Sequence, residues 1–109
     1  SPLGRGILTG KYRNSIPADS RAASPHLGQF VRSLLTDANQ KTVEALSTAA
    51  SGLGCTAVEL ALLWALQNKS VSSAITGARN AAQLRTILHA LHSEIPQQIY
   101  EALNEVSYR

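Results

Sequence analysis

The sequence contains no methionine, a single cysteine and few aromatic residues among its 109 positions. Cys55 has no partner for an intramolecular disulfide, which favours a reducing compartment such as the cytoplasm. Because the first residue is Ser1 and not methionine, we expect a segment of a longer protein. Aromatic residues make up only 5% of the chain, so its core must be aliphatic and rich in alanine, which favours helices over a β-sandwich.

Long hydrophobic runs and dense basic clusters are also lacking. No stretch approaches the roughly 20 apolar residues that a membrane helix needs, and the N-terminus has no secretory signal pattern. The net charge of +3 is mild and the basic residues are scattered, whereas duplex-binding proteins usually carry a dense basic stripe. We therefore expect neither a membrane nor a nucleic acid as partner, while a small phosphorylated ligand needs only a few such charges.

Apolar residues that recur at helical spacing predict a mainly α-helical chain with about five helices and one short strand. Residues 1–25 are rich in Gly, Pro and Ser and predict a loop with one helical turn near Gly4–Thr9. The strand candidate is Val71–Thr76. The expected helices, in chain order, run from Pro25 to about Leu35, from a cap at Thr36 or Asp37 to the glycines 52 and 54, from a cap at Thr56 to the break at 68–70, from Asn80 through His92, and after Pro96.

Local patterns predict the surroundings of individual side chains. Thr56 with Glu59 three residues later is a capping-box pattern, and the helix that follows is apolar on nearly all sides, so it should be deeply buried. The first helix is expected to bury Leu27 and Val31. Glu59 and Glu44 are interpreted as solvated carboxylates on helix faces.

The first stretch with candidate chemistry is the Gly-rich run Ser1–Gly6, which continues to Gly10-Lys11-Tyr12. Its small residues let the backbone approach a ligand closely. Backbone N–H groups there would face an anionic pyrophosphate, with Arg5 or Lys11 adding positive charge. An ordinary glycine-rich turn accounts for the same residues, and this alternative stays open.

The second stretch, Ile75–Asn80, joins the predicted strand to the start of the next helix. A strand, a glycine (Gly77) and a helix N-terminus together are typical of a phosphate site. Arg79 is unfavourable beside the positive end of the helix dipole, which indicates that it meets a phosphate, and Gln83 lies one turn later on the same face. The alternative is a solvated arginine at a helix start.

Other reactive side chains give weaker signals. His89 and His92 lie three residues apart on one helix, but without a third ligand nearby an exposed pair is favoured over a metal site. Cys55 falls in an apolar helical pattern and is interpreted as a small buried hydrophobe. No Ser/His/Asp or Cys/His arrangement indicates a nucleophile, so we predict no catalytic residue and no metal site in this chain.

In their order along the chain, the motifs resemble those of the aldo-keto reductases over essentially all 109 residues. Ser1-Pro2-Leu3-x-x-Gly6 is similar to the loop after the seventh barrel strand of that family. The run Leu60–Leu66 resembles its seventh main helix, and Val71–Arg79 resembles its eighth strand and cofactor loop. Within the family, the sequence at 20–22 and 53–56 is similar to that of the branch with potassium-channel β subunits and related bacterial reductases.

The resemblance implies a (β/α)8 barrel that binds NADPH and reduces aldehydes or ketones by hydride transfer. The chain would be the last part of that barrel, a single segment 1–109 in which 1–25 form the cofactor loop and 26–109 the helices and last barrel strand. It also implies a cofactor site. By this resemblance the pyrophosphate would be held by Ser1, Pro2, Leu3 and Gly6, and other phosphates by Lys11 and Arg21. The adenosine 2′-phosphate and base would be surrounded by Gly77, Arg79 and Gln83.

Several positions depart from the family pattern. Thr86 and Ile87 stand where the family often has an acidic residue and Asn, and Asp19 is a poor neighbour for phosphates. The family's catalytic tetrad of Asp, Tyr, Lys and His has no counterpart here, so the isolated chain is expected to be inactive.

The apolar faces of the predicted helices need a covering partner. We expect the remaining N-terminal part of the barrel or self-association, for example by pairing of Val71–Thr76 between subunits, to supply it. The leading interpretation is the cofactor side of an NADPH-dependent carbonyl reductase in the cytoplasm. The alternative is a non-catalytic helical interaction module with relic nucleotide residues.

Overall fold

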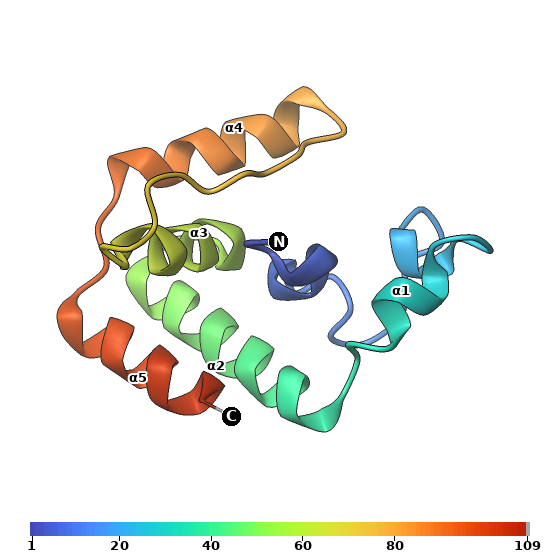
Figure 1. Ribbon diagram of the computed structural model, residues 1–109, viewed down its shortest axis with the longest axis horizontal. Helices are drawn as coiled ribbons and strands as arrows, with labels where there is room; N and C mark the ends of the chain where they lie inside the picture. The colour runs from blue at the N-terminus through green and yellow to red at the C-terminus, as the bar shows by residue number, and fades with distance from the viewer. Residues whose placement is uncertain (109) are drawn as a thin grey trace.

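The computed structural model describes residues 1–108, which fold into five α-helices and three 3₁₀ helices, labelled η, with no strand among them (Figure 1). The mainly helical fold class is therefore confirmed. In chain order the elements are η1 (Gly4–Thr9), η2 (Arg21–Ala23), α1 (Gly28–Arg32), α2 (Asp37–Leu53), α3 (Ala57–Gln67), α4 (Ala81–His89), η3 (Ala90–His92) and α5 (Gln97–Ser107).

Side-chain caps fix where the long helices begin. The Thr36 hydroxyl accepts the N–H of Asn39 at the start of α2, and Asn80 accepts the N–H of Gln83 at the start of α4. Thr56 and Glu59 form the predicted capping box before α3. Such caps satisfy N–H groups that have no partner inside the helix, so each stabilises its helix by about 1 kcal/mol.

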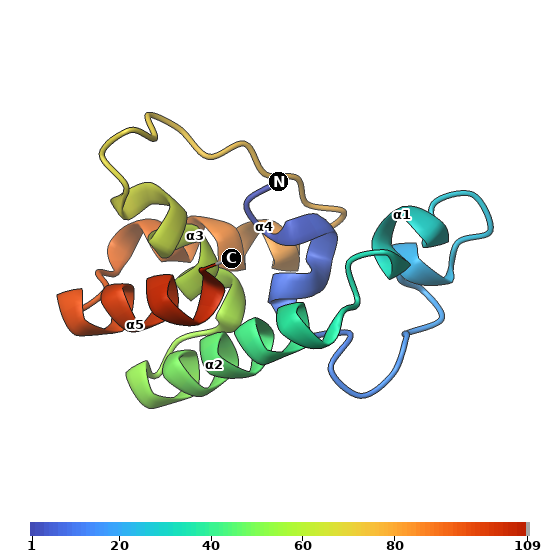
Figure 2. The ribbon, with the colours of Figure 1, turned by 60° about the horizontal axis from the view of Figure 1, so that its bottom comes forward.

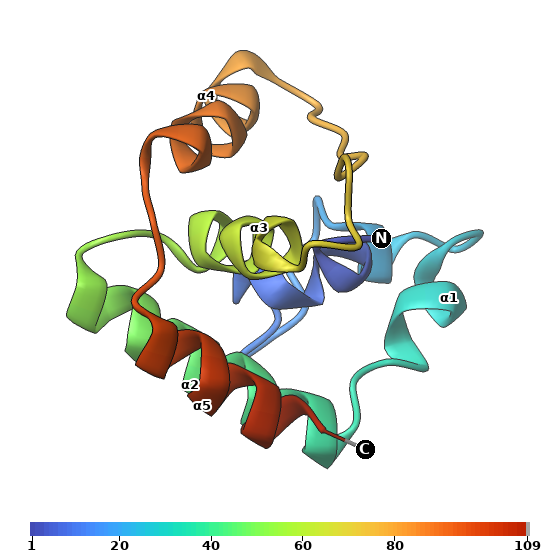
Figure 3. The same cartoon turned by 60° about the vertical axis from the view of Figure 1, so that its left-hand side comes forward.

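The main core lies where α2 packs against α3 and α5. Figure 3 shows α2 and α5 side by side on one side of α3, with α4 on the other side. Leu60 of α3 is fully buried there, which stabilises the fold by roughly 1.5–3 kcal/mol. The other buried members of this cluster are Leu46, Ala50, Ala61, Ile95 and Leu103.

A second, smaller core seats the N-terminal part of the chain on α2. It joins Ile7 of η1, Val31 of α1 and Val43 of α2, together with Tyr12 and Ala22. This core joins η1 to α2, and η1 also contacts α3 on its other side, near the chain's N-terminus (Figure 1).

The predicted strand Val71–Thr76 does not form. These residues run as an irregular, mostly exposed segment that arches from the end of α3 to the start of α4 (Figure 2). The physical reason is that a strand needs a neighbour to bond with its backbone N–H and C=O groups. No second strand lies beside it in residues 1–108.

Two further predictions need correction. The first helix is only Gly28–Arg32, and residues 25–27 form a turn in which Ser24 Oγ accepts the backbone N–H of Leu27. Leu27 is consequently 51% exposed, whereas Val31 is buried as predicted. In α3 the consecutive residues 59–62 are buried, as predicted, and Trp64, 36% exposed, is its single exposed residue.

The described residues include no single helix that is long and apolar enough to cross a membrane. Helices α2 and α3 pass such a test only as a pair, bent by 99° at their junction. Both of them contribute residues to the main core.

Candidate functional site

A large pocket with a volume of about 550 Å³ opens between η1, α3 and the start of α4. All nine residues that the sequence assigns to a cofactor line it: Ser1, Pro2, Leu3, Gly6, Lys11, Arg21, Gly77, Arg79 and Gln83. Its remaining lining residues are Arg5, Thr9, Val58, Ile75, Thr76, Ala78, Thr86 and Ile87. We call this cavity the large pocket; its volume falls in the range of small-molecule sites.

The charge of the large pocket has one sign. Four basic side chains line it, and none of its lining residues is acidic: the cations are Arg5, Lys11, Arg21 and Arg79. Cations gathered in a cleft raise the local concentration of anionic ligands. The arrangement therefore favours a ligand with several negative charges, such as a nucleotide with more than one phosphate.

The wall built by η1 depends on left-handed backbone geometry. Gly4, Arg5 and Gly6 have φ values of 57°, 59° and 94°. The N–H of Gly4 donates to the carbonyl of Ser1 and that of Gly6 to the carbonyl of Leu3, both at 3.0 Å. These two amides are thus used within the turn, and they do not face a pyrophosphate as the sequence had suggested.

The side chain of Lys11 lies directly over Gly6 of this turn. A Cβ atom at Gly6 would come within 3.0 Å of Cε and 3.2 Å of Nζ of Lys11. The glycine therefore makes room for the lysine, whose ammonium group also lies 5.4 Å from the ring centroid of Tyr12. Positive charge on this wall comes from Lys11 more than from backbone amides.

The opposite wall is the start of α4. The backbone N–H of Arg79 donates to Oε1 of Gln83 at 2.8 Å, and the N–H of Gln83 donates to Oδ1 of Asn80 at 2.9 Å. Two of the amides at this helix end are therefore occupied by the chain's own side chains. The guanidinium of Arg79 remains the charged group here, and its Nη1 donates to the carbonyl of Asp19 at 3.1 Å.

Arg21 reaches the large pocket from the loop that carries η2. Its neighbour Ala22 is fully buried and held from two sides. The Tyr12 hydroxyl accepts the Ala22 N–H at 3.3 Å, and Arg32 Nη1 donates to the Ala22 carbonyl at 2.7 Å. The backbone next to Arg21 is thus fixed while its side chain is exposed.

The uncharged side of the large pocket is built from apolar and hydroxyl side chains. Val58, Ile75 and Ile87 lie there with Thr76 and Thr86. Thr86 and Ile87 both come from α4. Nothing in the sequence singled out Val58, because its place depends on α3 packing beside η1.

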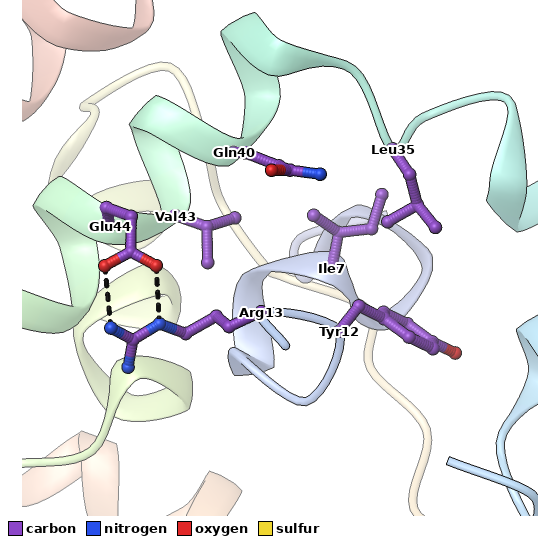
Figure 4. Close-up of a pocket in the computed structure, with 7 residues that line it drawn as sticks. All are labelled: Ile7, Tyr12, Arg13, Leu35, Gln40, Val43 and Glu44. Atoms are coloured by element: carbon purple, nitrogen blue, oxygen red, sulfur yellow. Dashed lines mark hydrogen bonds and ion pairs between the residues drawn. The ribbon is translucent and has the colours of Figure 1, made fainter. Parts of the chain in front are cut away.

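A second, much smaller cavity of about 20 Å³ lies between the loop after η1 and α2 (Figure 4). At its edge Arg13 donates two hydrogen bonds to the Glu44 carboxylate, at 2.7 and 2.6 Å. The hydrogen bonding from Arg13 holds the pKa of Glu44 below its usual value. Its size suits a single water molecule, so this cavity is not a candidate ligand site.

The remaining reactive groups do not build a centre. Glu59 was expected to be solvated but is only 6% exposed, because it caps α3 and bonds to Nδ1 of His89 at 3.0 Å. Cys55 is partly buried, and burial, followed by the charge of Glu59, raises the pKa of its thiol. No group of three or more His, Cys, Asp or Glu that would hold a metal occurs in the described part of the chain.

Comparison with known proteins agrees with the order of these motifs. The model of the aldo/keto reductase family matches residues 1–107. The chain belongs to this family. The sequence-based family assignment is therefore confirmed, and with it the correspondence of these helices to part of a (β/α)8 barrel.

Individual relatives of this aldo/keto reductase chain include plant and bacterial proteins. A probable voltage-gated potassium channel subunit beta of Oryza sativa subsp. japonica is 41% identical over 92 residues, which are 84% of this chain. The protein of the same name in Arabidopsis thaliana is 39% identical over the same share. An L-glyceraldehyde 3-phosphate reductase of Escherichia coli O157:H7 is 39% identical over 97 residues, 85% of this chain. The chain spans 28% of the length of each relative.

Proposed function

We propose that this chain is the cofactor-binding segment of an NADPH-dependent carbonyl reductase, and that the large pocket receives the dinucleotide. Membership of the aldo/keto reductase family supports an oxidoreductase segment. The observation that carries the finer proposal is the charge of the pocket: four cations from three separate parts of the chain and no carboxylate. A nicotinamide dinucleotide with an extra phosphate matches such a site better than an uncharged ligand does.

In this proposal each wall has its own task. Lys11 and Arg21 bind the phosphates between the two nucleosides, beside the turn Ser1–Gly6. Arg79 binds the adenosine 2′-phosphate, for which it gives up its bond to the Asp19 carbonyl, while Gln83 keeps the backbone of Arg79 in place. When bound, the dinucleotide supplies the hydride for an aldehyde or ketone.

The chain is proposed to bind and orient this cofactor without completing the reaction. Hydride transfer to a carbonyl needs a proton donor held in the same geometry. The large pocket is lined by no acidic residue, histidine or tyrosine that would serve as one. We propose that the donor comes from a further part of the barrel, which also covers the apolar faces, and that the protein works in the cytoplasm.

Titration with adenosine 2′,5′-bisphosphate tests the adenosine end of this site without the nicotinamide. Binding is expected to weaken tenfold to hundredfold in Arg79→Ala, since a charge-assisted bond contributes about 1.5–3 kcal/mol. Arg85→Ala is the matched control, because Arg85 lies on the same helix but outside the pocket lining. Equal affinities of the two variants would contradict the assignment of Arg79.

A second candidate function is a helical interaction module, as one observation favours it. Leu84, Leu88 and Leu91 form an exposed row along α4 and η3, at 47%, 50% and 66% exposure, and Ile75 is 87% exposed. Apolar surface of this kind favours association. Sedimentation velocity at rising concentration tests this proposal. The parent chain should associate and Leu88→Glu should stay monomeric, whereas a parent chain that stays monomeric would exclude self-association through this face.

A further inference from the structure

Arg5 holds an unusual backbone conformation for a residue with a Cβ atom. Its φ and ψ are 59° and 29°, which makes it the only non-glycine residue with a positive φ in residues 1–108. The left-handed region is unfavourable for L-residues other than glycine, and such outliers persist only where other contacts hold them. The side chain of Arg5 supplies those contacts.

Both contacts of Arg5 go to one residue, Phe30 of α1. The guanidinium carbon lies 3.4 Å from the centroid of the Phe30 ring, and Nη1 donates to the Phe30 carbonyl at 2.7 Å. Phe30 is 55% exposed, so its ring is not fixed by the core. Arg5 therefore lines the large pocket while its charge is placed on Phe30, and it is not free to bind a phosphate.

The Phe30 contact leads back to the large pocket through α1. Two residues after Phe30, Arg32 donates to the Ala22 carbonyl, and Ala22 is the direct neighbour of Arg21. The segment of residues 11–35 is thus bound by Arg5 at Phe30 and by Arg79 at Asp19. Binding of a phosphate by Arg79 would release the Asp19 contact, after which the segment is held by the Arg5 contact together with the packing of Tyr12, Ala22 and Val31 in the second core.

We propose that Arg5 and Phe30 form a latch that keeps the 11–35 segment closed on the large pocket, so that Arg21 faces a bound anion. Arg5 is then a positioning residue, and its effect on the ligand is transmitted by Phe30. The role of the latch in binding rests on the proposed function, whereas the latch itself is present without ligand.

The latch is tested by two variants that remove it and by one conservative variant that keeps it. Phe30→Leu removes the ring, Phe30→Tyr keeps it, and Arg5→Gly removes the cation while a glycine keeps the left-handed turn. The first readout is tryptic cleavage after Arg21 in the ligand-free chain, with cleavage after Lys69 as internal reference. Slow cleavage of a segment that opens transiently reports the population of its open form.

The second readout is the rate of NADPH dissociation. A cation–π contact at an exposed site corresponds to a change of about two- to fivefold in the open population. We expect Phe30→Leu and Arg5→Gly to speed cleavage after Arg21 by this factor and to speed NADPH dissociation by a similar factor, because release passes through the open form. The double variant should equal either single variant, and Phe30→Tyr should behave as the parent chain.

The possible failures are distinguishable. Cleavage after Arg21 that is unchanged in both variants, or that is equally fast in Phe30→Tyr and Phe30→Leu, overturns the latch whatever the cofactor result. Faster cleavage with an unchanged rate of NADPH dissociation overturns its positioning role. Absence of NADPH binding to the parent chain contradicts the proposed function, while the cleavage comparison still decides whether the latch exists.

Discussion

Oε1 of Glu59 lies 3.0 Å from Nδ1 of His89, so that the first turn of α3 is joined to the end of α4. The other oxygen of Glu59 accepts the backbone N–H of Thr56. The carboxylate is 8% exposed at its side chain, whereas the His89 ring is 67% exposed. One buried carboxylate thus serves two elements, and both of these elements line the large pocket.

Glu59→Ala should lower the free energy of unfolding by about 1–3 kcal/mol, because the capping box of α3 is lost and the Thr56 N–H and the His89 ring each lose a hydrogen-bond partner. Denaturant unfolding measures this change. His89→Ala is the control, since it leaves the capping box intact and removes an exposed ring. A loss in His89→Ala as large as that in Glu59→Ala would contradict a dominant role of the cap.

Two glycines inside helices should respond oppositely to alanine. At Gly28 a Cβ atom would come within 2.6 Å of the Ala22 carbonyl and would collide with Arg32 Nη1, so the bond between these two groups breaks. We expect Gly28→Ala to destabilise the fold by about 1–3 kcal/mol, as overpacking does. Gly52 has nothing within 4 Å of such a Cβ, so Gly52→Ala should stabilise it by about 0.5–1 kcal/mol. Thermal unfolding of both variants checks the signs; a stabilising Gly28→Ala would be inconsistent with the close packing of η2 on α1.

Glu44 should titrate at a lower pH in the folded chain than its ordinary value of 4.5, because Arg13 donates two hydrogen bonds to its ionised form. A lowered folded pKa means that this contribution to stability is present above about pH 4.5 and is lost as the pH falls through the folded value. NMR titration of the Glu44 carboxyl carbon measures it. In Arg13→Ala the pKa should return towards 4.5, and added salt should weaken the difference since the pair is exposed. An identical titration in both chains would show that the pair does not persist in solution.

The predictions that came true rest on local chemistry. Thr36, Thr56 and Asn80 cap helices through residues three positions later, so the starts of α2, α3 and α4 follow from short patterns. The η1 turn at Gly4–Thr9 was also predicted, because its glycines favour tight turns. Such patterns involve residues only a few positions apart, so they can be recognised without knowledge of the rest of the fold.

The predictions that failed depend on residues far away in the chain. A strand at Val71–Thr76 needs a second strand, which residues 1–108 do not provide. Glu59 is buried and bonds to His89, which lies 30 residues further along the chain. For the large pocket, the sequence and the family resemblance named nine of the residues that line it. They did not reveal that Arg5 is bound to Phe30, since that contact spans 25 positions.

The central claim is that the large pocket receives NADPH and that Arg79 recognises its extra phosphate. Calorimetric titration of the chain with NADPH, and with NADH as control, tests it most directly. The account predicts at least roughly tenfold tighter binding of NADPH, lost in Arg79→Ala and kept in Arg85→Ala, since one charge-assisted bond separates the two ligands. Equal affinity for both dinucleotides, or no binding of NADPH at millimolar concentration by the folded chain, would contradict it.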